Sequence, residues 1–227
     1  MGLPITVPPV HAGGFLDRFR TREQVIRYRD RYFTGRHARL DLRERAALRK
    51  LLSGLDVGVA LDVPCGTGRM SAILAEYADG VVLADGSSSM LEVAREDRHD
   101  LGPRCLQTDI NQIALASDSI DLVFCHRFLH HVHDPQARAR SLSELARVSR
   151  RYVVISFYPS GLRTRWRYLL HRALGRGGDA SRPTALPGFL DETARAGLRP
   201  VRTSDIRRFP FRATFYLFDK GERTDRA

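Results

Sequence analysis

The sequence predicts an α/β fold built on a doubly wound, mostly parallel sheet. Short apolar runs rich in Val, Ile and Leu alternate with helical patterns between residues 57 and 157, and this alternation is typical of parallel sheets. Three of the runs lead into an acid, namely Asp62, Asp85 and Asp109, at intervals of 23 and 24 residues. Each interval holds one helix and one strand, so we expect the acids at neighbouring strand ends. Ligands bind at that edge of open α/β sheets.

The length and composition fit one α/β domain with decorations. The chain has 227 residues, of which 43% are hydrophobic, and this allows a sizeable core. No segment approaches the roughly 20 apolar residues of a membrane span, and the N-terminus lacks the pattern of a secretory signal. The three cysteines form no C-x-x-C pair, which predicts reduced thiols in a cytoplasmic protein and no structural metal.

Positive charge avoids the centre of the chain. The net charge is +11, yet residues 58–149 contain 8 Arg against 13 Asp and Glu. The basic residues gather in the segments 18–50 and 163–182, and nearly all of them are arginine. Genome composition can explain the choice of arginine over lysine, but it does not explain this uneven distribution. The flanks are therefore candidates for contact with an anionic partner.

The segment 1–52 is predicted to be a basic N-terminal helical extension of a domain over residues 53–220. Residues 1–14 are rich in Pro and Gly and are expected to be loosely ordered. Residues 21–52 carry the pattern of one or two helices that break near residues 34–35.

The first strand is expected over residues 57–63, followed by a turn with Gly66 and Gly68 and a helical pattern over residues 69–78. This arrangement presents free backbone N–H groups to a ligand. The turn lacks the third glycine of a dinucleotide-binding motif and the Gly-Lys-Ser/Thr of a Walker loop. A plain structural turn is the alternative. Asp62 argues against it, because a buried carboxylate is costly without a cation or donor beside it.

The later elements follow in the order of a doubly wound sheet. Strands are expected over residues 81–85, 106–110 and 121–125, with a fifth strand that ends at residue 157. A basic insertion (160–184), a last helix (187–197, ended by Gly197) and two strands (201–209 and 211–218) complete the domain.

Four ordered segments resemble the motifs of the class I S-adenosylmethionine-dependent methyltransferases, and of the type 11-like domain in particular. They are L-D-V-P-C-G-T-G-R from Leu61, D-G-S-S-S-M-L-E-V-A from Asp85, L-Q-T-D-I from Leu106, and D-L-V-F-C-H-R-F-L-H-H-V-H-D from Asp121. The resemblance implies a Rossmann-like sheet of seven strands, of which the last two form an antiparallel pair. It also implies S-adenosyl-L-methionine as the cofactor.

The resemblance implies a role for each residue at this sheet edge. Gly66 and Gly68 would let the backbone approach the methionine part of the cofactor, and Asp62 would meet its ammonium group. Asp85 would accept hydrogen bonds from both ribose hydroxyls, since a carboxylate has suitable acceptor geometry. The remaining residues that the resemblance assigns to the cofactor site are Pro64, Cys65, Gly86, Met90, Asp109 (on the adenine amino group), Ile110 (on the adenine ring) and His126. For Asp109, the N-cap of a helix over residues 112–115 is the alternative.

Three histidines are candidates for a catalytic general base. His126 directly follows the fourth strand, and His130 and His131 lie in the Leu-His-His turn after it. A histidine can take a proton near neutral pH from the hydroxyl or amine that receives the methyl group. The alternatives are that these histidines orient backbone or cap a helix, and that transfer relies on proximity and alignment alone.

Residues 161–176, inside the insertion, have the period of an amphipathic helix, with Leu162 and Trp166 on the apolar face and arginines beside it. A lid helix with solvated arginines is one interpretation. Contact with an anionic membrane, an acidic substrate or RNA is the other. The Asn/Asp-Pro-Pro-aromatic motif of nucleic-acid amino methyltransferases is replaced by Cys125-His-Arg-Phe128, which argues against base N-methylation.

The sequence as a whole predicts methyl transfer from S-adenosylmethionine to a small-molecule or lipid-linked acceptor, at oxygen, nitrogen or carbon. An RNA methyltransferase that uses its basic flanks is one alternative. A protein that binds S-adenosylmethionine without transferring its methyl group is another. The expected location is the cytoplasm, including peripheral contact with the anionic inner face of the membrane.

Overall fold

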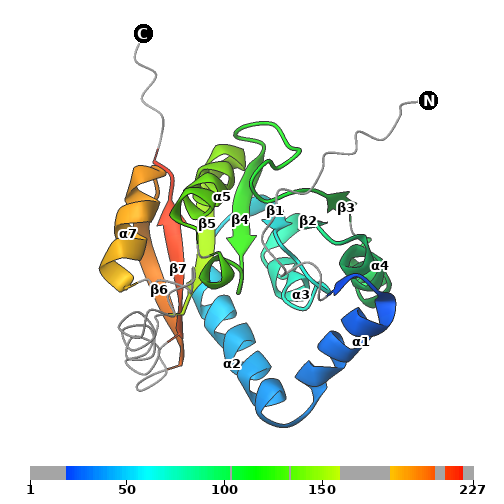
Figure 1. Cartoon of the computed structure of the whole chain (residues 1–227). Helices are drawn as coiled ribbons and strands as arrows, with labels where there is room; N and C mark the ends of the chain where they lie inside the picture. Colours follow the sequence, from blue (N-terminus) through cyan, green and yellow to red (C-terminus); the bar gives the residue numbers. More distant parts are fainter. Residues whose placement is uncertain (1–18, 103, 133, 159–184, 208–212, 222–227) are drawn as a thin grey trace, which may run out of the picture.

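The computed structural model describes residues 19–102, 104–132, 134–158, 185–207 and 213–221. In this part of the chain, helices cover both faces of a seven-stranded sheet (Figure 1). The strands are β1 (Val57–Asp62), β2 (Ala78–Asp85), β3 (Arg104–Gln107), β4 (Ile120–Cys125), β5 (Ser149–Phe157), β6 (Arg199–Arg207) and β7 (Ala213–Asp219). The α-helices are α1 (Arg22–Asp30), α2 (Gly35–Leu52), α3 (Ser71–Leu74), α4 (Ser88–Asp97), α5 (Pro135–Val148) and α7 (Leu186–Arg195). The 3-10 helices are η2 (Arg31–Phe33), η3 (His99–Leu101) and η4 (Leu129–His131).

The strand order in the sheet is β3-β2-β1-β4-β5-β7-β6. The first five strands of the chain are parallel, whereas β7 runs antiparallel to both β5 and β6. The predicted doubly wound sheet with a C-terminal antiparallel pair is therefore confirmed. After β3 the chain returns to the other side of β1, so β1 and β4 flank the switch point where ligands bind in such sheets.

Alternating side chains of β4 divide the core between the two faces of the sheet. Leu122 and Phe124 belong to the apolar cluster that includes Leu48, Leu51 and other residues of α2 and α3. Val123 and Cys125 belong to the opposite cluster, which includes residues of α5 and α7. Helix α2 is thus part of the main core, although its sequence lies in the predicted N-terminal extension. The domain boundary expected after residue 52 stays a prediction.

Helices α1 and α2 form a V beyond the carboxyl ends of the central strands (Figure 1). The predicted break near residues 34–35 is confirmed, because α2 begins at Gly35 with φ +57°. Helix α1 begins with a capping box in which the Thr21 and Gln24 side chains bond each other's backbone. It is fixed to α4 by ion pairs, including Arg29 to Asp97 at 3.0 Å. The V therefore borders the edge where the site was expected.

Two elements differ from their predicted extents. The helix expected over residues 69–78 shrinks to α3, because Ala78 already pairs with Val57 as the first residue of β2. The third strand ends at Gln107, before Asp109, which lies in a tight turn where its Oδ1 accepts from the Asn111 backbone N–H at 2.8 Å. Residues 112–115 accordingly form no helix.

The insertion expected over residues 160–184, with its helix, lies outside the described residues. The described chain stops at residue 158 and resumes at residue 185. Among the helices that the structure describes, none has the length and apolar character needed to cross a membrane.

Candidate active site

The turn after β1, which contains Gly66 and Gly68, forms the centre of the candidate site. Gly66 and Gly68 both have positive φ, +56° and +67°, a conformation that costs a residue with a Cβ more than it costs glycine. The two glycines face different surroundings. A Cβ on Gly66 would meet no atom of the described residues within 4 Å, whereas one on Gly68 would meet Arg98 Cγ at 2.9 Å and Leu83 Cδ2 at 3.3 Å. Gly66 therefore borders open space, and Gly68 allows the turn to pack on α4 and β2.

Asp85, at the end of β2, holds this turn in place. Its Oδ2 accepts a hydrogen bond from the Gly66 backbone N–H at 2.9 Å, and its Oδ1 accepts one from the Ser87 N–H at 2.9 Å. The side chain is buried, and burial raises the pKa of Asp85. Ser87 caps α4 through its hydroxyl. Each carboxylate oxygen retains acceptor capacity for a further donor.

Asp62, at the end of β1, is 2% exposed. Its Oδ2 accepts a hydrogen bond from the Ser71 hydroxyl at 2.6 Å. Burial raises the pKa of Asp62 to about 7, although the Ser71 hydrogen bond works in the opposite direction. A cationic group beside Asp62 would stabilise the ionised carboxylate and lower this pKa.

The other residues assigned to the cofactor lie around this turn and the β2 and β3 ends. Met90 is 4% exposed and packs with Val25 of α1. Cys65 is buried, and burial raises the pKa of its thiol. The Gly86 carbonyl accepts from Gln107 Nε2 at 3.3 Å. Ile110 is 7% exposed and belongs to the core, Pro64 is half-buried, and Asp109 is half-buried in its turn.

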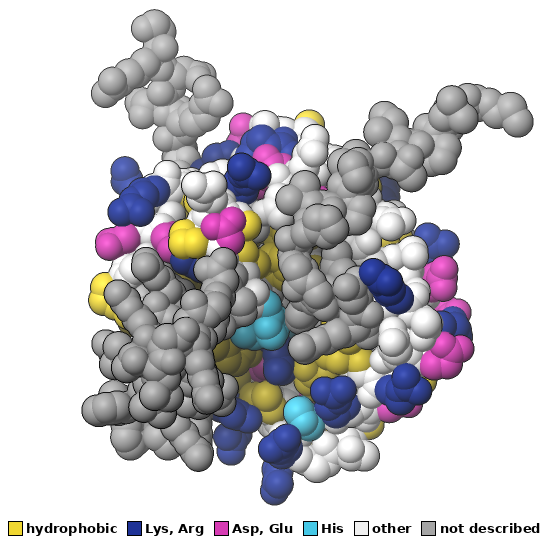
Figure 2. All heavy atoms as spheres, in the orientation of Figure 1, with side chains coloured by type: hydrophobic (Ala, Val, Ile, Leu, Met, Phe, Trp, Pro, Cys, Tyr) yellow, Lys and Arg dark blue, Asp and Glu magenta, His cyan; other side chains and the backbone are white. Residues whose placement is uncertain are grey.

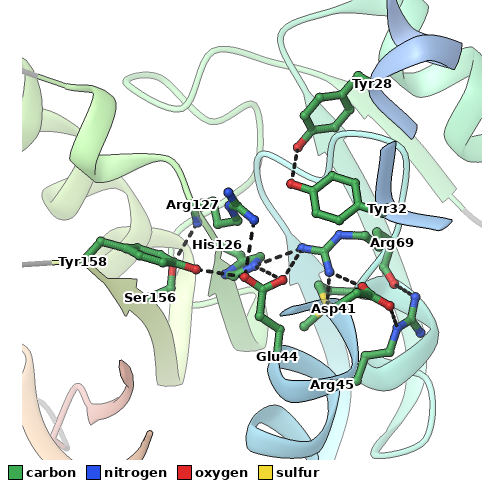
Figure 3. Close-up of polar contacts among 11 residues, drawn as sticks. Tyr28, Tyr32, Asp41, Glu44, Arg45, Arg69, His126, Arg127, Ser156 and Tyr158 are labelled. Carbon is green, nitrogen blue, oxygen red and sulfur yellow. Dashed lines mark hydrogen bonds and ion pairs between the residues drawn. The ribbon is translucent and has the colours of Figure 1, made fainter. Parts of the chain in front are cut away.

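A buried glutamate connects helix α2 to this edge. Glu44 is fully buried, and its Oε2 pairs with Arg69 at 2.8 Å and lies 3.5 Å from His126 Nε2 (Figure 3). Its Oε1 accepts a hydrogen bond from the Tyr158 hydroxyl at 3.0 Å and lies 3.4 Å from the Arg127 guanidinium. Burial alone would raise the pKa of Glu44, but the neighbouring His126, Arg69 and Arg127 hold it below its usual range.

Arg69 directly follows the glycine turn and contacts several residues of α2 and η2. Its guanidinium donates to Asp41, which also pairs with Arg45 at 2.6 Å. Arg45 in turn donates to the Arg69 carbonyl at 2.9 Å. The guanidinium of Arg69 lies 4.3 Å from the centroid of the Tyr32 ring. Residues of α2 and η2 thereby fix the position of the turn.

His126 is enclosed in this network. Its ring packs against Phe124 and Phe215 at centroid distances of 5.7 and 5.1 Å. Its Nε2 lies 3.2 Å from Arg69, which can only donate, so Nε2 accepts and the ring is neutral. Burial lowers the pKa of His126 to about 4. The Nε2 lone pair is therefore engaged by Arg69.

His130 and His131 lie in η4 and are exposed. Their ring centroids are 3.9 Å apart, and the His130 ring lies 5.0 Å from the Tyr158 ring. In the space-filling view, histidine and basic side chains lie in a hollow at the centre of the face that α1 and α2 border (Figure 2). Whether any of the three histidines acts as a base stays a prediction, and their contacts favour His130 and His131 over His126.

Residues 61–156 match a family model described as a methyltransferase domain. The chain carries a methyltransferase domain. The match runs from β1 into β5, so it contains the glycine turn, the acids Asp62, Asp85 and Asp109, and the three histidines. The family predicted from the four sequence motifs is therefore confirmed.

Two curated proteins with similar sequences are each named a ubiquinone biosynthesis O-methyltransferase. That of Coxiella burnetii is 31% identical over 87 residues, which cover 37% of this chain and 37% of that protein. That of Nitrosospira multiformis is 34% identical over 99 residues, which cover 42% of this chain and 40% of that protein. The chain thus spans less than half the length of these curated relatives.

A solved structure of magnesium protoporphyrin IX methyltransferase from Synechocystis PCC 6803, with bound SAM, has a similar fold. Its TM-score is 0.70 over 95% of this chain and 100% of that chain, at 17% identity. A second structure of that protein, with bound SAH, gives a TM-score of 0.69. At this level of identity the likeness shows the fold of the methyltransferase domain.

The sequence did not predict that α2 packs in the main core and contacts the candidate site. A signal was present, because Glu44 interrupts an apolar helical stripe that contains Leu40, Leu48 and Leu51. An acid at such a position needs a buried cationic partner. The sequence does not reveal that Arg69 and Arg127 supply it.

Proposed function

We propose that this chain transfers the methyl group of S-adenosylmethionine to a small-molecule acceptor. The observation that carries the proposal is the conjunction, at the β1–β4 switch point, of open space over Gly66 with the buried carboxylates of Asp62 and Asp85. This conjunction lies inside the methyltransferase domain. The named relatives and the structural neighbour act on small molecules according to their names, which supports the same class of acceptor here.

The residues present fit the cofactor. Asp62 is a buried carboxylate with a raised pKa, and Ser71 is its one side-chain donor among the described residues, which suits a nearby ammonium group. Asp85 has acceptor capacity left after its two backbone bonds, which suits a pair of ribose hydroxyls. Gly66 leaves room for close approach of a ligand to the backbone.

When bound, the cofactor supplies an activated methyl group on a sulfonium. The protein's own part is to hold donor and acceptor in line and to exclude water, and such positioning can supply most of the rate enhancement. Glu44, Arg69 and Tyr158 fix the α2 side of the site. His130 and His131, at η4, are the residues that we propose could take a proton from the acceptor.

The direct test is incubation with methyl-labelled S-adenosylmethionine and fractionated cell extract. Label in a low-molecular-mass or lipid fraction supports the proposal, and label in RNA or protein contradicts it. If no fraction is labelled while the cofactor binds, the chain is a binding protein without transfer activity.

A lipid-linked acceptor is a second candidate, favoured by the outer face of α2. Arg36, Arg39 and Arg43 are exposed and form no ion pair with any described residue. Phe33 and Leu42 beside them are 72% and 67% exposed. Figure 2 displays basic side chains along the rim where α1 and α2 meet. Cations with interspersed large apolar side chains suit the surface of an anionic membrane. The basic insertion expected to share this role lies outside the described residues.

A further inference from the structure

Arg127 has an unusual backbone conformation at the end of the central strand. Two residues after β4, it adopts φ +55°, a value found among the described non-glycine residues only here and at Asp118. Such a conformation costs roughly 1–3 kcal/mol and persists only where its surroundings enforce it. One contact that holds this conformation is a hydrogen bond from the Arg127 backbone N–H to Ser156 Oγ of β5, at 2.7 Å. The side chain is thereby held at the switch point, beside Glu44 and Tyr158 (Figure 3).

The guanidinium of Arg127 lacks a strong acidic partner of its own. Within the described part of the chain it pairs only with Glu44, at 3.4 Å, and Glu44 already pairs with Arg69 at 2.8 Å. The cluster contains three arginines and two acids, namely Arg45, Arg69 and Arg127 with Asp41 and Glu44. His126 is neutral in this arrangement. One positive charge is therefore left unbalanced, and Arg127, at 27% side-chain exposure, is more open than Arg69 at 14%.

Aromatic rings flank this cation. The guanidinium carbon of Arg127 lies 5.7 Å from the Tyr32 ring centroid and 5.8 Å from that of Tyr158. The Tyr158 ring also packs beside the His130 ring, at a centroid distance of 5.0 Å. A planar guanidinium matches a carboxylate or phosphate through two parallel hydrogen bonds, and rings at this spacing can contact a flat ligand.

We propose that Arg127 binds a carboxylate or phosphate group of the methyl acceptor, and that Tyr158 contacts its flat body. The inference rests on the proposed methyltransferase function and adds a substrate class to it. The acceptor is then an anionic compound with a planar, aromatic-like portion. The anion completes the charge balance that the five ionic residues leave open.

The test uses simple probes on the full chain saturated with S-adenosylhomocysteine. Benzoate, phenyl phosphate and their neutral counterpart benzamide are titrated at constant ionic strength, and binding is followed by ligand-observed NMR. We expect benzoate or phenyl phosphate to bind at least tenfold more tightly than benzamide, and the tighter of the two identifies the anion. Arg127→Gln should remove the preference, Arg127→Lys should retain part of it, and the control Arg95→Gln, on the exposed side of α4, should keep all of it.

Equal binding of charged and neutral probes, or a preference that survives in Arg127→Gln, overturns the proposal. So does the absence of any binding by the two anions. A tenfold loss of S-adenosylhomocysteine affinity in Arg127→Gln also overturns it, because the anion would then be the carboxylate of the cofactor. Thermal unfolding of both Arg127 variants checks that they fold. If the parent binds no S-adenosylhomocysteine at all, the proposed function fails, which is a different outcome.

Discussion

Glu44 of α2 and Arg69 of the glycine turn form an ion pair of 2.8 Å between two largely buried side chains. The pair joins a helix that precedes the family-model match to the first loop inside it. Buried ion pairs add less to stability than their geometry suggests, because both charges lose their hydration. Their stronger effect is on position, since an unpaired buried charge is expensive. The position of α2 and that of the glycine turn are therefore coupled.

Glu44→Gln should destabilise the protein by about 3 kcal/mol at pH 7, because the buried Arg69 loses its charged partner. The pKa of Glu44 is held below its usual range by its cationic neighbours. Its contribution is then complete above the unfolded pKa of about 4.3 and declines as the pH falls below that value. Urea unfolding of parent and variant at pH 7, 5 and 3.5 measures this, and the difference between their free energies of unfolding should be smaller at pH 3.5 than at pH 7.

A constant difference between parent and Glu44→Gln across these pH values would show that the Glu44 carboxylate is not the source of the effect. Glu92→Gln is the matched control, since Glu92 is exposed on α4.

The buried His126 should give the free energy of unfolding a second dependence on pH, at higher pH than that of Glu44. Burial lowers its pKa to about 4, whereas the unfolded chain takes up this proton near pH 6.5. The free energy of unfolding should therefore fall as the pH drops from about 6.5 toward 4, by at most about 1.4 kcal/mol per pH unit. His126→Asn should flatten this slope, while His99→Asn, at an exposed position, should not. NMR titration of the His126 ring gives an independent reading, and a pKa near 6.5 would contradict the enclosed, neutral ring.

The parallel sheet and the acids at the ends of β1 and β2 were predictable because parallel strands repeat at a regular chain spacing. Asp62 and Asp85 lie where that spacing places them, at the ends of β1 and β2. Asp109 falls two residues beyond β3, because a short-range turn with Asn111 competes with strand pairing there. The network around Glu44 was not predictable, because it joins residues up to 114 positions apart, from Glu44 to Tyr158. Such contacts depend on how α2 packs, which no local pattern specifies.

The two glycines of the turn allow a matched comparison. Gly66→Ala and Gly68→Ala impose a similar backbone cost, because both positions have positive φ. Only the Gly68 methyl would collide with packed atoms, Arg98 Cγ and Leu83 Cδ2. We expect Gly68→Ala to lower the melting temperature more, and Gly66→Ala to weaken S-adenosylhomocysteine binding by at least tenfold with a smaller loss of stability. Equal affinities in parent and Gly66→Ala would show that the space over Gly66 is not the ligand site.

The basic face of α2 predicts binding to anionic vesicles. Changing Arg36, Arg39 and Arg43 together to Gln removes three exposed charges. Because each is worth about 1 kcal/mol at an anionic surface, vesicle binding should fall by roughly two orders of magnitude. The control is a variant with the same charge change at exposed positions elsewhere, Arg95, Arg104 and Arg140. Co-sedimentation with phosphatidylserine vesicles measures the difference. If both triple variants lose vesicle binding equally, the effect comes from net charge and not from the face of α2.

We propose that S-adenosylmethionine binds between Gly66, Asp62 and Asp85. Calorimetric titration with S-adenosylhomocysteine, in the parent and in Asp85→Asn, tests it most directly. We predict one site per chain in the parent. We predict a loss of about 1.5–3 kcal/mol of binding free energy in Asp85→Asn, because charge-assisted hydrogen bonds to the ribose are lost. The exposed Asp79→Asn should bind as the parent does. Absence of binding in the parent, or unchanged affinity in Asp85→Asn, would show that the cofactor does not bind at this site through Asp85.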